Sequence, residues 1–147
     1  MRHFRIADFR TFAILAAAAF LCSACAVEWK REFALQCRLD EKIALRDALY
    51  FGRNIPGGGT VTDADWEHFR DESVASAFPD GFTELNAVGH WRNSAGVRVA
   101  EATRIVLVVH TDDGVSEQAL DRIVTTYRER FRQESVLRER SRVCVRF

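Results

Sequence analysis

The 147-residue sequence lacks the usual signatures of metal and acyl-enzyme catalysis. It has only four histidines, and none of them stands in an HExxH pattern or at a metal-ligand spacing from cysteine. The G-x-S-x-G turn that presents a nucleophilic serine is missing as well. These absences count against zinc hydrolysis and acyl-enzyme chemistry. We therefore expect no metal site and no cofactor.

The sequence also lacks an excess of positive charge. Its 21 basic and 21 acidic residues give a formal net charge of +0 at neutral pH. A nucleic-acid-binding domain of this size usually carries a strong positive field. We therefore expect no nucleic-acid partner.

No apolar run is long enough to be read as a membrane span. The longest run, Thr11 to Ala26, is shorter than the roughly 17 to 25 residues that a spanning helix needs. It follows Arg2, Arg5 and Arg10 and ends in small residues, which is typical of an export signal. The pattern predicts a signal peptide over residues 1–26 and an exported protein.

Two endings of this signal fit the sequence. Ala24 and Ala26 form an A-x-A cleavage pattern, which would release a soluble periplasmic protein. Alternatively, Cys25 after Ser23-Ala24 resembles the lipid-modified cysteine of bacterial lipoproteins, which would anchor the protein in the envelope. In that second case the lipid would be the only contact with the membrane.

Cysteine is scarce outside the signal. Of four cysteines, only Cys37 and Cys144 lie beyond residue 26. In an oxidising compartment such a pair is first interpreted as a disulfide, here closing a loop of about a hundred residues. Two separate buried thiols are the alternative.

The organising segment is Thr103–His110, TRIVLVVH, which is apolar on both of its alternating faces. Such a strand needs cover above and below, so we expect it in the interior of a sheet. Before it, residues 27–46 are dense in charge and weak in periodicity, which indicates an N-terminal arm. Residues 47–147 then form one domain.

The remaining patterns give the order of elements. We expect strands at 48–53 and 83–92, the interior strand, and a last strand within 136–147. Thr62 should cap a first helix that ends before Pro79, and Ser116 a second helix over 117–133. This βαββαβ order predicts an α+β ferredoxin-like sandwich, an antiparallel sheet with both helices on one face. In that topology the last strand lies beside the first, which brings Cys144 toward Cys37.

The uncovered sheet face is the predicted site. If Thr83, Leu85 and Trp91 face the helices, alternation places a second set on the open face. That set contains Asn86, His90, Arg92, Arg104, Val106, Val108 and His110.

Five segments in order resemble a known family: YFGRNIPGGG, VTDADW, FPDGFTELNAVGHWR, FRQESVLR and CVRF. Together they resemble a bacterial family of exported, lipoprotein-like domains of unknown function (DUF3574), from about Asp47 onward. The resemblance implies no established activity. By its motifs, the positions to test first are Arg53, Trp91, Arg92, Gln133 and Glu134.

Two functional hypotheses follow. The first is a non-catalytic envelope module that binds a protein partner or small ligand on the open face, with self-association as a homodimer. Its binding residues would be Asn86, Arg92, Arg53, Gln133 and Glu134. The alternative is a cofactor-independent enzyme on the same face, with His90 or His110 as base and Arg92 holding an anionic substrate.

Overall fold

The structure, a computed structural model, describes residues 35–146. The elements are β1 (Lys42–Gly52), α2 (Asp63–Phe69) continued by the π-helix η1 (Arg70–Ala75), β2 (Thr83–Arg92), β3 (Arg98–His110), α3 (Gly114–Phe131) and β4 (Leu137–Val145). The predicted signal peptide, Cys25 and Phe147 lie outside the described residues. None of the described helices combines the length and the apolar character needed to cross a bilayer.

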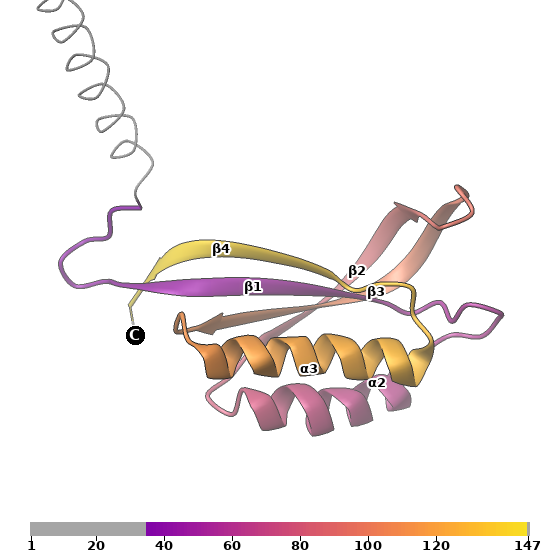
Figure 1. The fold of residues 1–147 in the computed structure, drawn as a ribbon, viewed down its shortest axis with the longest axis horizontal. Helices are drawn as coiled ribbons and strands as arrows, with labels where there is room; N and C mark the ends of the chain where they lie inside the picture. Colours follow the sequence, from indigo (N-terminus) through magenta and orange to yellow (C-terminus); the bar gives the residue numbers. More distant parts are fainter. Residues whose placement is uncertain (1–34, 147) are drawn as a thin grey trace, which may run out of the picture. The chain divides into compact units, whose positions relative to one another are not determined.

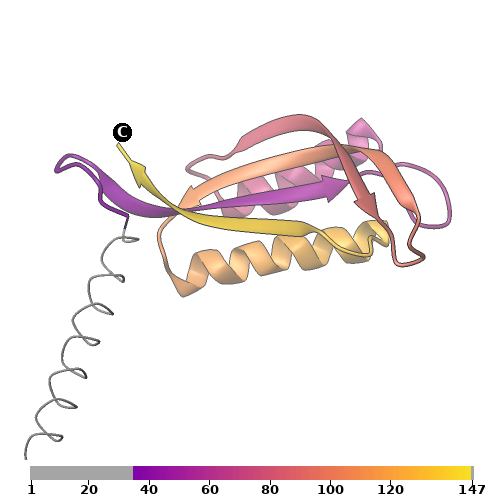
Figure 2. The same cartoon turned by 90° about the horizontal axis from the view of Figure 1, so that it is seen from above.

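The sheet has four strands in the order β2-β3-β1-β4, and every neighbouring pair is antiparallel. Both helical segments lie on the same side of it (Figure 1), and the view from above looks onto the side without helices (Figure 2). The predicted α+β ferredoxin-like arrangement is therefore confirmed. The segment Thr103–His110 belongs to β3, which lies between β2 and β1 as an interior strand.

The core fills the space between the sheet and the helices. On β1, Leu49 and Phe51 point into it, and both are fully buried. The Phe51 ring packs 4.7 Å from Tyr127 of α3 and 5.2 Å from Trp66 of α2, measured between centroids. The phenol of Tyr127 donates a hydrogen bond to the Gly52 carbonyl at 2.9 Å, which ties α3 to the end of β1.

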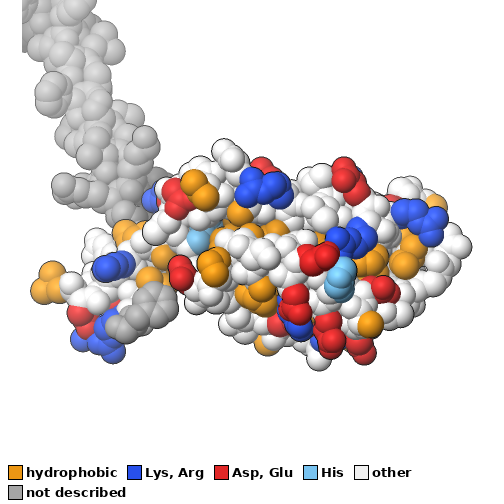
Figure 3. Space-filling model, turned by 90° about the horizontal axis from the view of Figure 1, so that it is seen from below, with side chains coloured by type: hydrophobic (Ala, Val, Ile, Leu, Met, Phe, Trp, Pro, Cys, Tyr) orange, Lys and Arg blue, Asp and Glu red, His pale blue; other side chains and the backbone are white. Residues whose placement is uncertain are grey.

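On the outer surface of the helical layer, charged side chains lie among hydrophobic ones (Figure 3). Figure 3 shows acidic and basic side chains interspersed there and not sorted by sign. This distribution agrees with the balanced net charge of the sequence. It offers no large field of one sign for a polyanion or polycation.

The start of the first helix is as predicted. Thr62 is the N-cap, and its hydroxyl accepts from the backbone N–H of Asp65 while the Asp65 carboxylate accepts from that of Thr62. This capping box satisfies two backbone donors that a helix start leaves without intrahelical partners. The helix then widens into η1, ending before Pro79.

The start of the second helix differs from the prediction. Ser116 is not its N-cap, because α3 begins at Gly114 and the Asp113 carboxylate accepts from the Ser116 N–H at 2.7 Å. An aspartate is as good an N-cap as a serine, and its charge also favours the positive end of the helix dipole. Local composition could not decide between two capping residues that stand three positions apart.

Two strands are longer than the sequence patterns indicated. β1 begins at Lys42, inside the segment predicted as an arm, and β3 begins at Arg98. The reason is pairing, since the first residues of β1 form a ladder with the last residues of β4, from Lys42 opposite Val145 onward. Backbone hydrogen bonds to a neighbouring strand extend a strand beyond its apolar residues.

The prediction of which face is open is wrong. Glu84 and Asn86 lie opposite Val106 and Arg104 in the β2–β3 ladder, and Val106 is fully buried beneath the helices. Asn86, His90, Arg92, Arg104, Val106, Val108 and His110 therefore share the helix-covered side. The open side instead carries the residues that alternate with them, including Leu85, Trp91 and Ile105.

The inversion has a physical reason. Because β3 is apolar on both faces, alternation alone could not decide which face the helices cover. On the covered side the polar residues of β2 find partners from α2. Trp66 Nε1 donates to Glu84 at 2.8 Å, and Arg104 pairs with Glu84 at 3.2 Å and with Asp63 at 2.8 Å.

The predicted disulfide between Cys37 and Cys144 is present, with the two Cα atoms 5.5 Å apart. Cys144 lies opposite Ile43 in the β1–β4 ladder, as expected for a last strand beside the first. The bond therefore fastens the segment before β1 to the end of β4.

Candidate functional site

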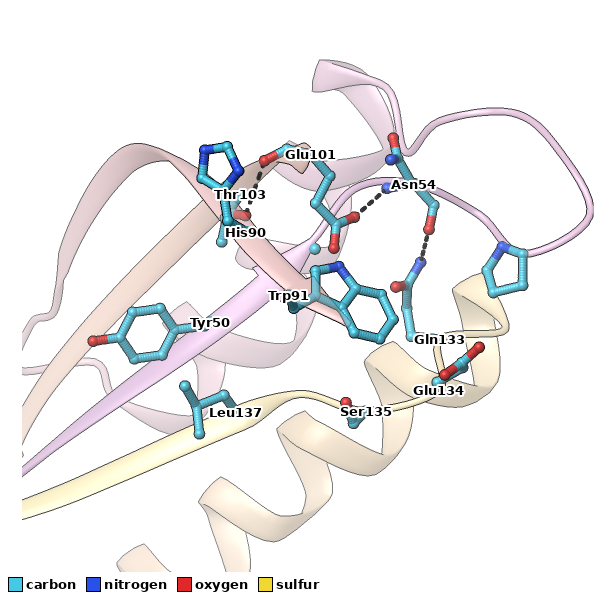
Figure 4. Close-up of a pocket in the computed structure, with 13 residues that line it drawn as sticks. Tyr50, Asn54, His90, Trp91, Glu101, Thr103, Gln133, Glu134, Ser135 and Leu137 are labelled. Atoms are coloured by element: carbon cyan, nitrogen blue, oxygen red, sulfur yellow. Dashed lines mark hydrogen bonds between the residues drawn. The ribbon is translucent and has the colours of Figure 1, made fainter. Parts of the chain in front are cut away.

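A pocket of about 280 Å³ lies on the open side of the sheet, near the end of β1. Its floor comes from three strands, with Gly52 of β1, Gly89 of β2, and Glu101 and Thr103 of β3. The turn from α3 into β4 forms another side (Figure 4). We call this cavity the open-face pocket.

Two glycines make room for the polar floor. Gly89 lies opposite Glu101, and Gly52 lies opposite Thr103. A Cβ atom at Gly52 would stand 2.5 Å from Glu101 Oε1, and one at Gly89 would stand 2.6 Å from Thr103 Oγ1. Both distances are too short for non-bonded atoms, so the carboxyl of Glu101 can occupy its place only because Gly52 has no side chain.

Glu101 is the most enclosed ionisable group of the pocket. The residue is only 8% exposed, and its Oε2 accepts from the backbone N–H of Asn54 at 2.9 Å. Within residues 35–146, its Oε1 has no hydrogen-bond donor. A buried carboxyl with one oxygen left for a ligand is the arrangement that binding and proton transfer both require.

The segment that holds Glu101 is itself braced. Gln133 Nε2 donates to the Asn54 carbonyl at 2.9 Å, so the turn after α3 is tied to the segment after β1. Figure 4 shows this chain of contacts running from Glu101 through Asn54 to Gln133. Such outer contacts keep a functional carboxyl in one position.

Aromatic side chains form the apolar part of the pocket. Trp91 lines the pocket together with Glu101, and Tyr50 lies opposite Leu137 in the β1–β4 ladder (Figure 4). The Tyr50 phenol donates to Glu139 at 2.5 Å. That hydrogen bond, helped by burial, raises the pKa of Tyr50, so the phenol stays protonated and neutral at physiological pH.

Some of the predicted site residues meet here. Gln133, Glu134 and His90 line the open-face pocket together with Trp91. Both Glu134 oxygens accept from Ser94, at 3.2 Å from its N–H and 3.1 Å from its hydroxyl. The His90 ring points away from Trp91 in Figure 4, in keeping with its place on the opposite alternation of β2.

The other predicted residues lie elsewhere. Arg53 donates to the Val61 carbonyl at 2.7 Å and to Asp63 at 2.8 Å, which closes the glycine-rich turn before α2. Asn86 accepts from Arg104 on the covered side. Arg92 donates to the Gly96 carbonyl at 2.8 Å within the β2–β3 hairpin.

His110 is held in a separate buried cluster. Its Nε2 lies 2.7 Å from Asp47, a fully buried carboxylate that also accepts from Arg138 at 2.6 Å and Arg140 at 3.1 Å. A second cavity of about 430 Å³ adjoins His110 at the opposite end of β1. There the ring already has its partners, so this cavity has no unengaged histidine nitrogen comparable to the free oxygen of Glu101.

Sequence reasoning missed Glu101, Gly52, Gly89 and Tyr50. The sequence contains signals for three of these residues, Glu101, Gly52 and Gly89. Glu101 is a charged residue on the same face of its strand as the apolar Ile105 and Leu107. A glycine inside a strand, such as Gly52 or Gly89, often marks the close approach of another group or a ligand. Alternation does not single them out as long as the opposite face is predicted to be open.

One cluster in the described part of the chain has metal-ligand character: Cys37, Glu41 and Cys144. The two sulfurs are bonded to each other, so neither is available as the thiolate that a soft metal ion binds. This cluster serves as a covalent link between the segment before β1 and β4.

Fold and site together define an α+β open sheet with an acidic pocket on its uncovered face. The profile of a family described as "Protein of unknown function (DUF3574)" matches residues 46–147. The chain belongs to this family, as the resemblance of its motifs indicated. None of the curated proteins compared with this chain matches it.

One solved structure of a phage enzyme shares the fold. A phage SAM lyase in complex with S-methyl-5'-thioadenosine superposes with a TM-score of 0.53 at 15% identity, covering 78% of this chain and 97% of the lyase chain. The apo state of a phage SAM lyase gives a TM-score of 0.45 at 19% identity, with the same coverage. At these identities the likeness shows the fold alone.

The first functional hypothesis, a non-catalytic module, is contradicted. The fold that this chain shares is one that carries an enzyme, so missing motifs were a poor reason to prefer a non-catalytic role. The pocket on the open face agrees better with the alternative, a small-molecule enzyme at that face. The residues involved differ from those expected, because the predicted open face is the covered one.

Proposed function

We propose that this domain is a cofactor-independent enzyme that transfers a proton from a small molecule bound in the open-face pocket. One observation carries the proposal: Glu101, 8% exposed, has one oxygen held by the Asn54 N–H and the other without a donor among the described residues. A carboxyl held in this way beside a ligand-sized cavity is a candidate general base. The shared fold with an enzyme acting on a small molecule supports it.

The proposed step uses the chain's own groups. Glu101 Oε1 accepts a proton from the substrate, and the electron pair of the broken bond stays on the substrate, where it forms a double bond as a leaving group departs with its own pair. Asn54 and Gln133 keep the carboxyl in place, and Trp91 excludes water from one side. Holding the base in a fixed position next to the substrate lowers the barrier of the proton transfer, because less freedom of motion has to be lost in the reaction.

The test is a turnover screen with a matched variant. The purified protein is incubated with a panel of small molecules that includes S-adenosylmethionine, and products are followed by mass spectrometry. We expect Glu101→Gln to lower turnover by at least about 100-fold, in the range for loss of a general base. Glu67→Gln, on the exposed surface of α2, is the control and should leave turnover unchanged.

One outcome of this screen would contradict the proposed role of Glu101. Turnover that survives Glu101→Gln in a protein with unchanged circular dichroism and unfolding temperature would remove Glu101 as the base. The pocket would then need another role.

We also propose that the protein works outside the cytoplasm, in the periplasm or attached to the envelope by a lipid on Cys25. The signal pattern of residues 1–26 supports export, and a disulfide between Cys37 and Cys144 fits an oxidising compartment. Intact mass of the protein recovered from its host distinguishes the two endings. A chain starting near Val27 without added mass, a chain starting at lipid-modified Cys25, and an uncleaved chain give three different masses, and the last would contradict the proposal.

A further inference from the structure

The open-face pocket is acidic and aromatic. Glu101 and Glu134 contribute carboxyl groups to its lining, and Trp91 and Tyr50 contribute rings. Among the residues that the structure describes, no lysine or arginine lines it. An anionic ligand would therefore meet two carboxyl groups and neither a lysine nor an arginine.

The burial of Glu101 adds to this excess of negative over positive groups in the pocket. A carboxylate that is largely removed from water loses part of its hydration, and here one backbone N–H binds Oε2 while Oε1 is left to the pocket. Within residues 35–146, the other buried carboxylate is Asp47, and it is compensated by Arg138, Arg140 and His110. Glu101 has no such cation from the described chain, so the missing positive charge is one that a ligand can bring.

The aromatic lining of the pocket indicates which kind of cation fits it. Trp91 and Glu101 line the same pocket (Figure 4), so a positive centre bound there has both a carboxyl group and an indole ring among its surroundings. Tryptophan is the aromatic side chain that attracts cations best, and aromatic walls are a known means of recognising methylated cations. A methylated onium ion needs few hydrogen-bond acceptors, which suits a lining with an apolar side.

The size of the pocket limits the ligand further. A volume of about 280 Å³ is at the lower end for small-molecule sites. We infer that the open-face pocket binds a small organic onium cation, a quaternary ammonium or sulfonium compound, with its positive centre between Glu101 and Trp91. This inference rests on the proposed function in that it names the substrate class of the same pocket.

Binding can be measured without knowing the natural substrate. Choline and the trimethylsulfonium ion serve as cationic probes, and 3,3-dimethylbutan-1-ol, in which carbon replaces the choline nitrogen, serves as a neutral probe of the same shape. Titration calorimetry, or the fluorescence of the protein's tryptophans, follows each. We expect both cations to bind, and choline to bind at least about 10-fold more tightly than the neutral alcohol.

Variants locate the binding. Glu101→Gln should weaken choline at least about 10-fold and abolish its advantage over the neutral alcohol, while Glu67→Gln changes neither. Trp91→Leu should weaken choline about 3- to 10-fold with Glu101 intact, because the cation–aromatic contact is lost. Glu134→Gln, at the rim, tests the charge without touching the buried floor, and a 2- to 3-fold loss is expected.

Two results would overturn the inference. One is a neutral alcohol that binds as tightly as choline, and the other is choline affinity that neither Glu101→Gln nor Glu134→Gln changes. Turnover of a neutral or anionic substrate that depends on Glu101 would sink the onium inference and leave the proposed function standing. Selective onium binding at Glu101 without turnover of any panel member would support the onium inference and contradict the proposed function.

Discussion

Two positions on the open side of the sheet are defined by the absence of a side chain. Gly52 leaves the space that the Glu101 carboxyl occupies, and Gly89 does the same for the hydroxyl of Thr103. Neither glycine has a positive φ, so neither is required by backbone conformation. Their role is therefore to leave room for the side chains of Glu101 and Thr103, and a substitution by alanine tests this role.

We predict that Gly52→Ala displaces the Glu101 carboxyl and lowers the free energy of unfolding by about 1 to 3 kcal/mol, the usual cost of overpacking. Turnover and onium binding should fall together. The double variant Gly52→Ala/Glu101→Ala should recover most of the stability but not the binding. Urea unfolding and choline titration measure the two effects.

Gly114 provides the matched control, since a Cβ atom there meets nothing within 4 Å. Gly114→Ala should leave stability unchanged or slightly higher. Equal losses for both alanine variants would mean that the contact with Glu101 is not the cause.

Asp47 is the second residue where one side chain holds several elements together. It is fully buried on β1 and binds His110 of β3 and two arginines of β4. We predict that Asp47→Ala lowers the free energy of unfolding by about 3 kcal/mol or more, because it leaves buried donors without their acceptor. Asp121, 69% exposed and paired with Arg138, is the control, and Asp121→Asn should cost less than about 1 kcal/mol.

At the level of elements, capping explains where the helices begin. The Thr62–Asp65 box was recognisable because both residues stand at their capping positions in the sequence. At α3 the two candidates stand three residues apart, and Asp113 takes the position because its carboxylate accepts a hydrogen bond from the Ser116 N–H. Hydrogen bonding to that N–H lowers the pKa of Asp113 to about 2.

This lowered pKa predicts a pH dependence. The charged form of Asp113 stabilises the folded protein at pH values above its unfolded pKa of 3.8, and the contribution is lost as the pH falls from there toward about 2. Asp113→Asn keeps a cap acceptor without the charge. The wild type should exceed this variant in stability at pH 6, and the difference should shrink between pH 4 and pH 2 in urea unfolding curves. A difference that stays constant over that interval would contradict the assignment.

At the level of the whole molecule, one covalent bond joins residues far apart in sequence. The Cys37–Cys144 disulfide spans a separation of 107 residues and links the segment before β1 to β4. In the chain-entropy description, closing a loop of this length stabilises the folded state by about 4 to 5 kcal/mol. We predict that reductant lowers the unfolding midpoint in urea strongly, and that the Cys37→Ser/Cys144→Ser variant shows the same midpoint with and without reductant.

The open side of the sheet predicts self-association. Leu85, Ile105, Tyr50 and Leu137 form one row across all four strands, and Leu85 and Leu137 are 46% and 59% exposed. Such an apolar row favours a second copy of this chain as its cover. We expect light scattering to report more than one chain per particle, and Leu85→Lys to give single chains. A monomer at every concentration would contradict this.

The sequence by itself determined the elements, their order and the bond between Cys37 and Cys144. These follow from local causes: capping residues, alternating apolar positions, and the rule that in a βαββαβ sandwich the last strand lies beside the first. Family membership followed from the same ordered motifs.

Only the tertiary structure decided which face of the sheet the helices cover. β3 is apolar on both sides, so Val106 and Ile105 were equally suited to the core, and packing with α2 and α3 chose Val106. That choice moved Asn86, Arg92 and His110 away from the open side and placed Glu101 on it. The pocket follows from the same choice, because Gly52 and Glu101 meet only when neighbouring strands pair in this register.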